Sequence, residues 1–279
     1  MKIFSWCNPN YFKFCNALVR SIRYHGNEYE IILHLMDFSD DQKQFVEHLF
    51  RDDSKIKFLY SSHKDYHIKV TNPFEYYRNS RPRYFLKLLE EYQENLLTFG
   101  ANGLVFSKLH YIEDALQEND FVFMERKKQI VQNVKTDQTH VRRINELDQH
   151  VKQFNLDLDQ VLDQTTGKVV LLGTHGIQNN PNTVDTIKRW IQYVENETTM
   201  NRTFSDMNLF VKSFIEKQDE LGIKFKTLTD WDQPRERNRF CDTLLLEGNP
   251  IWFAKGPQKH SNRVYLDKVD FFNKWTYKL

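Results

Sequence analysis

The residues best suited to ligand chemistry begin at a polar break near the middle of the chain. Two apolar runs, Leu96–Phe99 and Leu104–Phe106, flank the segment Gly100-Ala101-Asn102-Gly103. A strand that stops at two glycines lets its backbone approach another group closely, because glycine has no Cβ. In open α/β sheets the ligand lies at the carboxyl ends of the strands, where this break is expected. The alternative is a tight turn between two core strands.

Positive charge is the second chemical feature of the sequence. The apolar segment Ile251–Ala254 precedes Lys255-Gly256-Pro257-Gln258-Lys259. Further candidates are Arg81, Arg83 and Arg263. Arginine binds phosphate in a bidentate manner and lysine acts as a point charge. For each of them the alternative is an ordinary solvated charge.

Two polar positions in the second half follow or open predicted elements. Val169–Leu172 is predicted to be a strand that runs into Gly173-Thr174-His175-Gly176-Ile177. Asp206 lies in Ser205-Asp206-Met207-Asn208, where a helix over Phe204–Lys217 is expected to begin. The alternatives are a turn with a surface histidine and an N-terminal helix cap. A cap at Asp206 is compatible with a role in binding only if the helix start points at the pocket.

The elements that must position these residues begin with a βαβαβ series. Lys2–Cys7, Ile31–Met36 and Ile56–Tyr60 are predicted strands, and the second is nearly continuous in apolar residues, as a buried parallel strand should be. The connections carry inward-facing residues at helical spacing, namely Phe12, Cys15, Leu18, Val19 and Ile22, and then Phe45, Val46, Leu49 and Phe50. This series is typical of a doubly wound nucleotide-binding domain.

The rest of the chain continues the alternation of helices and strands. Residues 61–80 are predicted to be a loop with a short helix, and Arg81–Gln93 a strong helix with Pro82 near its start. Further predicted helices cover Tyr111–Gln117 and Val184–Val194, and further strands Phe121–Met124 and Ile223–Leu228. Residues 126–166 are polar but keep a helical rhythm, which indicates a helical insertion or part of an acceptor-side subdomain. The chain ends in an aromatic-rich segment, Phe271–Trp275.

Composition excludes several classes of protein. A net charge of +1 argues against a bulk electrostatic nucleic-acid binder. The three cysteines, Cys7, Cys15 and Cys241, lack metal-ligand spacing, which favours a reducing compartment and no zinc site. No apolar run approaches the length of a membrane span, and no signal-peptide pattern opens the sequence. A soluble cytoplasmic protein is the expectation.

The order of these elements resembles that of the GT-A glycosyltransferases. The resemblance rests on the βαβαβ opening, the helix of the Arg-Pro…Leu-Leu type, and the strand, polar break and strand that follow. In that family the break carries Asp-x-Asp, whose carboxylates hold a divalent cation that neutralises the leaving diphosphate. Here Gly100-Ala101-Asn102 occupies the matching place, without either carboxylate. Asn102 could offer an oxygen to a metal or donate to a phosphate or ribose oxygen, but it has no charge.

A second motif points to the glycogenin- and galactosyltransferase-like (family-eight-like) branch. That branch has His-x-x-Gly-x-x-Lys, in which the histidine binds the metal and the lysine contacts the diphosphate. Residues 253–259 fit the spacing with Phe253 in the histidine position, while Gly256 and Lys259 are kept. The resemblance therefore implies a donor site with weak metal binding or none, in which positive charge replaces the cation. Lys259 is the foremost candidate, because its spacing from Gly256 fits the motif.

The resemblance also implies roles for the other candidates. Cys7, Asn8 and Tyr11 follow the first strand, where base and ribose bind in this fold; Tyr11 could stack on the base or belong to the core. The segment around His175 matches one that lines the sugar and acceptor pocket. The segment around Asp206 matches one whose side chains face the transferred sugar, and Asp206 is the nearest candidate for the base that an inverting enzyme needs.

The expected fold is a single GT-A-like α/β domain with a mostly parallel central sheet and helical additions. Its parts are a nucleotide-binding half (1–125), a helical insertion (126–166) and an acceptor-side half (167–279). The expected function is transfer of a hexosyl or pentosyl group from a nucleoside-diphosphate sugar, foremost a UDP-sugar, to a glycan or other hydroxyl acceptor. Mn²⁺ or Mg²⁺ is expected to bind weakly or not to be needed.

Two other functions were weighed against transfer. A non-catalytic protein of this fold that binds a sugar nucleotide or a glycan is the main alternative, supported by the missing Asp-x-Asp. A nucleotide-binding enzyme of other chemistry is disfavoured, because the sequence has neither Gly-x-Gly-x-x-Gly nor a phosphate-binding P-loop.

Overall fold

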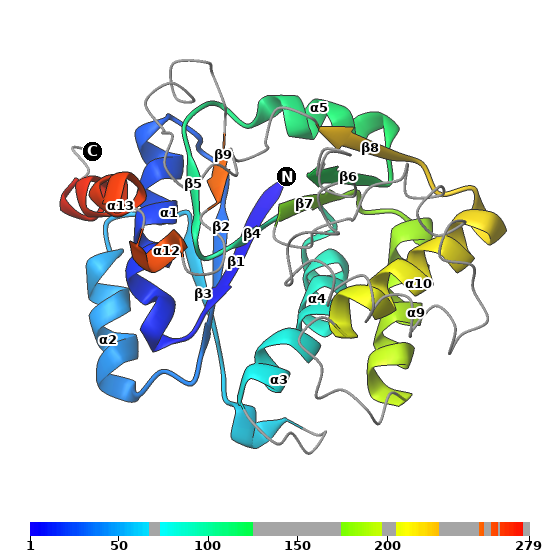
Figure 1. The fold of residues 1–279 in the computed structure, drawn as a ribbon, viewed down its shortest axis with the longest axis horizontal. Coiled ribbons are helices and arrows are strands. Elements are labelled where there is room, and N and C mark those ends of the chain that lie inside the picture. Colours follow the sequence, from blue (N-terminus) through cyan, green and yellow to red (C-terminus); the bar gives the residue numbers. More distant parts are fainter. Residues whose placement is uncertain are drawn as a thin grey trace. The chain divides into compact units, whose positions relative to one another are not determined.

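The computed structural model describes residues 1–66, 73–124, 174–196, 205–228, 251–253, 258–261 and 263–275. The chain divides into two compact units (Figure 1). Unit 1 comprises Met1–Asp65, Leu96–Asp114 and Asp230–Leu279, and unit 2 comprises Tyr66–Asn95 and Ala115–Thr229. Both units combine strands with helices, and parallel strand pairs outnumber antiparallel ones, so the predicted α/β class is confirmed.

Unit 1 contains four parallel strands in the order β3-β2-β1-β4. They are β1 (Lys2–Cys7), β2 (Ile31–Met36), β3 (Ile56–Ser61) and β4 (Leu96–Gly100). β2 is buried along its whole length, and β1 and β4 along nearly all of theirs. These are the apolar runs that the sequence predicts for strands covered on both faces. On the outer strand β3 only Ile56 is fully buried.

Helices α1 (Phe12–Tyr24) and α2 (Asp40–Leu49) connect the first three strands. α2 begins in a capping box, in which the Ser39 hydroxyl accepts from the Gln42 N–H and the Gln42 side chain accepts from the Ser39 N–H at 2.9 Å. The prediction that Phe45 faces inward is wrong, because its side chain is 59% exposed. Val46 and Phe50, four residues apart, form the buried stripe instead, and Phe45 lies one position off it.

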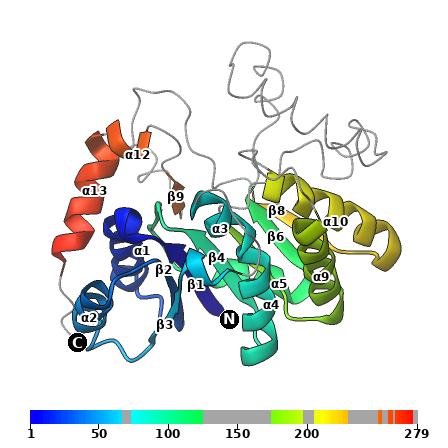
Figure 2. The same cartoon turned by 90° about the horizontal axis from the view of Figure 1, so that it is seen from below.

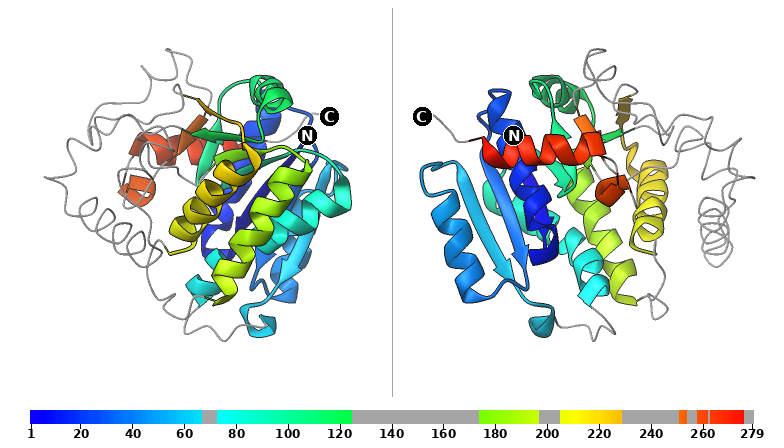
Figure 3. Two further views of the ribbon diagram at one scale, coloured as in Figure 1. Left: turned by 90° about the vertical axis from the view of Figure 1, so that its right-hand side faces the viewer. Right: turned by 60° about the vertical axis from the view of Figure 1, so that its left-hand side comes forward.

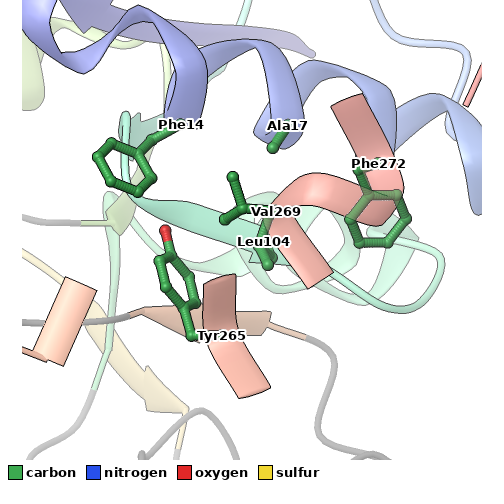
Figure 4. Close-up of a cluster of buried hydrophobic side chains, with 6 residues drawn as sticks. All are labelled: Phe14, Ala17, Leu104, Tyr265, Val269 and Phe272. Carbon is green, nitrogen blue, oxygen red and sulfur yellow. The ribbon is translucent and has the colours of Figure 1, made fainter. Parts of the chain in front are cut away.

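A second element of unit 1 joins distant parts of the sequence. Strand β5 (Gly103–Val105) pairs antiparallel with β9 (Ile251–Phe253). Helix α13 (Arg263–Lys274) lies across α1 (Figure 3) and includes most of the aromatic segment predicted at the end of the chain. Figure 4 shows the cluster that these elements bury between them: Phe14, Ala17, Leu104, Tyr265, Val269 and Phe272.

Unit 2 contains three strands and several longer helices. β6 (Phe121–Met124) pairs parallel with β8 (Phe225–Leu228) and antiparallel with β7 (Thr174–Ile177). Helices α9 (Pro181–Asn196) and α10 (Ser205–Leu221) lie side by side (Figure 2), and α9 also packs against α4 (Arg81–Tyr92). The short helix α3 (Pro73–Asn79) precedes α4, and α5 (His110–Glu118) begins in unit 1 and ends in unit 2.

The alternative interpretation of the His175 segment, a turn with a surface histidine, is wrong. Thr174–Ile177 is strand β7, and His175 is fully buried rather than on the surface. Gly176 is needed for packing rather than turning, since a Cβ there would lie 3.0 Å from a methyl carbon of Leu116. The predicted strand at 169–172 and the helical insertion at 126–166 lie outside the described residues. Among the helices of the described ranges, none is long and apolar enough to cross a membrane.

Candidate functional site

The polar break lies at the carboxyl ends of two neighbouring strands of unit 1. β1 ends at Cys7 and β4 at Gly100, and the parallel register sets Trp6 beside Gly100. Parallel strands end on the same edge of a sheet, so Asn8 and Asn102, which follow these strands, emerge at one edge. This is the edge at which open α/β sheets bind ligands.

The β5–β9 pairing brings the second motif to this break. The antiparallel register sets Phe253 opposite Gly103, directly after Asn102. The two segments that the sequence analysis singled out, 150 residues apart, are therefore backbone neighbours. Lys255 and Gly256 lie outside the described residues. Lys259 lies in the short helix α12 (Gln258–Ser261), and its side chain also lies outside them.

A buried tyrosine anchors the break. The Tyr265 hydroxyl donates a hydrogen bond of 2.9 Å to the main-chain oxygen of Asn102. The Tyr265 ring is fully buried and packs against Trp252 and Phe14, with ring centroids 5.2 and 6.0 Å apart. Burial raises the pKa of the Tyr265 phenol well above its ordinary value, so the group stays a neutral donor. The path of the backbone after β4 is thus fixed from α13.

The residues at the break do not fit a divalent cation. Gly100 has no side chain and Phe253 supplies no ligand atom, which leaves the amide oxygen of Asn102. Mg²⁺ and similar hard cations prefer several oxygen ligands, carboxylates above all. Within the described ranges, moreover, no group of three or more His, Cys, Asp or Glu side chains could hold a metal ion.

The turn after β1 is held by Asn8. Its side-chain oxygen accepts from the Tyr11 N–H at 3.2 Å, and its main-chain oxygen accepts from the same group at 3.0 Å. Tyr11 is half-buried and its ring contacts Phe14 at 6.1 Å, beside the cluster of Figure 4. The Cys7 thiol is buried, and burial, followed by the neighbouring Cys15, raises its pKa. Cys7 is therefore a neutral, packed side chain and not a nucleophile.

The sequence analysis missed Asp37, at the carboxyl end of β2. Asp37 has φ of 60°, a left-handed conformation that is uncommon for a residue other than glycine. One of its carboxylate oxygens accepts from the Ser62 hydroxyl at 3.0 Å and from the His63 N–H at 2.9 Å. The same oxygen lies 2.9 Å from Nδ1 of His63. An aspartate directly after an apolar strand was the available signal, since aspartate tolerates this conformation.

The candidates of unit 2 form a different environment around His175. Its ring contacts those of Phe85 and Phe210, at centroid distances of 5.4 and 6.5 Å. Burial, and then the charge of Arg81, lower the pKa of His175 to about 3, so the imidazole is neutral at physiological pH. Burial, and then Arg78, lower the pKa of Arg81 to about 9, which still leaves Arg81 charged. The Arg81 Nε donates to the main-chain oxygen of Arg78 at 3.2 Å.

For the remaining candidates, the described residues show no contacts that bring them together. Asp206 is the second residue of α10, a place that suits a carboxylate at a helix N-terminus, and its side chain lies outside the described residues. Arg83 is exposed and forms an ion pair with Glu195 on α9. Arg263 is exposed at the start of α13. For Arg83 the solvated surface charge is the better description.

Comparisons with known proteins complete the description. No protein-family model matches the sequence, and no curated protein has a similar sequence. The structure is similar to the galactosyltransferase LgtC in complex with donor and acceptor sugar analogs, with a TM-score of 0.57 and 13% identity over 100% of this chain and 98% of LgtC. It is also similar to the bifunctional glycosyltransferase WbbM, with a TM-score of 0.59 and 13% identity over 99% of this chain.

A third similar structure is the glycosyltransferase GlyE of Streptococcus pneumoniae, with a TM-score of 0.53 and 11% identity over 98% of this chain. The chain spans 50% of the WbbM chain and 62% of the GlyE chain. At these identities the likeness establishes the fold. The chain has the α/β architecture of GT-A glycosyltransferases, as the sequence analysis predicts.

Proposed function

We propose that this chain is a glycosyltransferase that moves a sugar from a nucleoside-diphosphate sugar to a hydroxyl group of a glycan. One observation carries the proposal. The carboxyl ends of β1 and β4 and the β5–β9 pair bring Asn8, Gly100–Asn102 and Phe253 to one edge of the sheet in unit 1. This is the edge at which the fold binds ligands. LgtC, which has the same fold, is known in complex with donor and acceptor sugar analogs, and this supports the same classes of ligand here.

The donor diphosphate is neutralised by side chains, with a metal ion weakly bound or absent. Replacing two carboxylates by Gly100 and Asn102 removes two negative charges that would repel a diphosphate, so the need for a cation falls as well. Lys259 and Lys255 are the candidates that supply the positive charge, and Arg81 is a further candidate. Gly100 lets the backbone approach the donor, and the Asn102 amide donates to a phosphate or ribose oxygen.

The chemical step needs few further groups. In an inverting reaction Asp206 is the candidate base that accepts the proton of the acceptor hydroxyl. A neutral His175 does not act as an acid at physiological pH, so we assign it a positioning role in the sugar and acceptor pocket. The buried free thiols Cys7 and Cys15 agree with a reducing compartment, and we place the reaction in the cytoplasm.

Donor turnover tests the proposal directly. The chain is incubated with UDP-hexoses and UDP-pentoses, with oligosaccharide acceptors, and either with EDTA or with Mn²⁺, and UDP release is measured. We expect UDP release that is nearly unchanged by EDTA. Lys259→Ala should lower UDP release. Arg83→Ala is the matched control, because Arg83 is a surface charge paired with Glu195, and it should leave UDP release unchanged. Release only with Mn²⁺ would contradict the side-chain mechanism, and no release with any donor would contradict transfer.

A non-catalytic protein that binds a sugar nucleotide is the second candidate function. The absence of carboxylates at Gly100 and Asn102, together with the structural use of the Asn102 oxygen by Tyr265, favours it. UDP binding by calorimetry without UDP release in the same samples would select this alternative.

Metal affinity tests whether residues 100–102 bind a divalent cation. In the double variant Gly100→Asp, Asn102→Asp, two carboxylates face one cation, so Mn²⁺ affinity in the presence of UDP should rise. Activity need not rise, because Phe253 still supplies no third ligand. Tight, stoichiometric Mn²⁺ binding by the unaltered chain through residues 100–102 would contradict weak metal binding.

A further inference from the structure

Unit 2 contains a polar cavity that the proposed transfer reaction does not use. The cavity has a volume of about 630 Å³, within the range of small-molecule sites. Asp120 and Lys224, which line it, directly precede β6 and β8, and Gln178 directly follows the antiparallel β7. The cavity therefore lies at the amino ends of β6 and β8, whereas open α/β sheets bind their ligands at the carboxyl ends of the strands.

The wall of the cavity is rigid before any ligand arrives. Asp120 is only 6% exposed, and its two carboxylate oxygens accept from the Asn180 side chain at 2.5 Å and from the Lys224 N–H at 2.7 Å. Its main-chain oxygen accepts from the Gln178 N–H at 2.9 Å, and its N–H donates to the Lys224 oxygen at 2.9 Å. A site that is already ordered costs less conformational entropy when a ligand binds.

The groups that face the cavity include three neutral carboxamides and three charged side chains. Gln117, Gln178 and Asn182 each carry a carboxamide, with donors and an acceptor on the same group. Glu118 and Asp120 add two carboxylates, Lys224 adds one ammonium group, and Leu221 adds the apolar surface. At Gly222 the rim is open, since a Cβ there would meet no atom within 4 Å.

These groups exclude most classes of ligand. A phosphate or nucleotide would need several cationic groups, and the lining has one lysine beside two carboxylates. A lipid would need an apolar wall. A divalent cation would need several carboxylate oxygens, and because both oxygens of Asp120 already accept hydrogen bonds from the protein, only Glu118 is left to supply them. A neutral ligand with many hydroxyl groups, each able to donate and accept, matches the carboxamides.

We propose that this cavity binds a saccharide, two or three sugar units of a glycan chain, at a place separate from the transfer site. The inference does not require catalysis, because it rests on the cavity of unit 2 alone. In a transferase it would hold part of an acceptor chain away from the reacting hydroxyl. In a non-catalytic protein it would be a glycan-binding site in its own right.

Binding of short oligosaccharides to the full chain tests the inference. The probes are lactose, maltotriose, cellotriose and chitotriose, measured by saturation-transfer NMR and by calorimetry. At least one of them should bind with a Kd of about 1 mM or tighter. Asn182→Phe, which fills the cavity, should weaken that binding by roughly tenfold or more, because it removes a hydrogen-bonding group and occupies the space of the ligand. Gln192→Phe makes the same change on an exposed position of α9 outside the cavity and should leave binding unchanged.

A second variant guards against misfolding. Gln117 is exposed on α5, so Gln117→Ala leaves the fold intact and should weaken binding roughly threefold or more by removing one hydrogen-bonding group. Failure of all four probes to bind, or equal binding by the chain and by Asn182→Phe, would overturn the inference. UDP release measured in the same samples separates it from the proposed function, because release can fail while saccharide binding persists, and the reverse.

Discussion

The candidate residues of unit 1 and unit 2 are positioned by different means. In unit 1, backbone pairing and a few hydrogen bonds fix the path of the chain at the break: Trp6 beside Gly100, Gly103 beside Phe253, and Tyr265 on the Asn102 oxygen. In unit 2, the rings of Phe85 and Phe210 surround a neutral His175, next to a charged Arg81. The comparison teaches that strand register can fix the backbone geometry of a segment whatever side chains it carries, whereas an environment built from side chains depends on each of them.

The largest expected effect comes from Phe85, whose ring lies 5.4 Å from that of His175 and 6.0 Å from that of Trp190. Phe85→Ala should lower the free energy of unfolding of unit 2 by about 3–5 kcal/mol, through lost burial and a cavity. Hydrogen exchange resolved by segment should show lost protection in α4 and α9, with α1 and β1 unaffected. As the control, Phe45→Ala, at a 59% exposed position, should cost about 0.5 kcal/mol or less. Equal loss of protection in α1 and β1 would break the comparison, because the units would then unfold together.

The second effect concerns the pH dependence of stability. The pKa of His175 is about 3 in the folded state, and its ordinary value of 6.5 applies in the unfolded state. Between pH 3 and pH 6.5 the folded protein therefore binds fewer protons than the unfolded protein. The free energy of unfolding is therefore unaffected by His175 above pH 6.5. It falls as the pH decreases from 6.5 toward 3, by about 1.4 kcal/mol per pH unit for one proton. Guanidinium titrations between these values should show this slope, and His175→Gln should reduce it. An unchanged slope in His175→Gln would assign the acid sensitivity to other groups.

The third effect concerns affinity rather than stability. If the lysine that follows Phe253 in the motif contacts the diphosphate, Lys259→Ala should weaken UDP binding by about 1.5–3 kcal/mol, the scale of a hydrogen bond to a charged group. Calorimetry measures it, and thermal melting checks that the fold is kept. An unchanged Kd would mean that Lys259 is an ordinary solvated charge that does not contact the diphosphate. The proposed donor site in unit 1 would then rest on backbone geometry alone.

The smallest effect concerns the anchor of the break. Tyr265→Phe removes the hydroxyl that donates to Asn102 and should cost about 1 kcal/mol of stability. Because the backbone after β4 then loses a fixed point, UDP affinity should fall as well. Loss of stability with no change in UDP affinity would mean that strand pairing alone holds the break.

Much of unit 1 could be predicted from the sequence because its signals are local. Uninterrupted apolar runs gave β1, β2 and β4, and the paired glycines located the break after Gly100. The failures have tertiary causes. Gly173 and Gly176 suggested a turn, although Gly176 is needed inside a strand to make room for Leu116. Asp37 directly follows β2, and its contacts with Ser62 and His63 could not be predicted from the sequence, because they come from a different strand connection.

The anchor of the break also has a consequence for synthesis of the chain. Tyr265 reaches back 163 residues to Asn102, and β9 reaches back a similar distance to β5. A chain emerging from the ribosome can pair β1 to β4 early, since their partners are already made. Until β9 and α13 have been synthesised, however, Phe14 and Leu104 lack the helix that covers them, and β5 has no partner strand. The nascent protein thus exposes an apolar surface from the synthesis of β5 to that of α13, and such a surface is where a chaperone would bind.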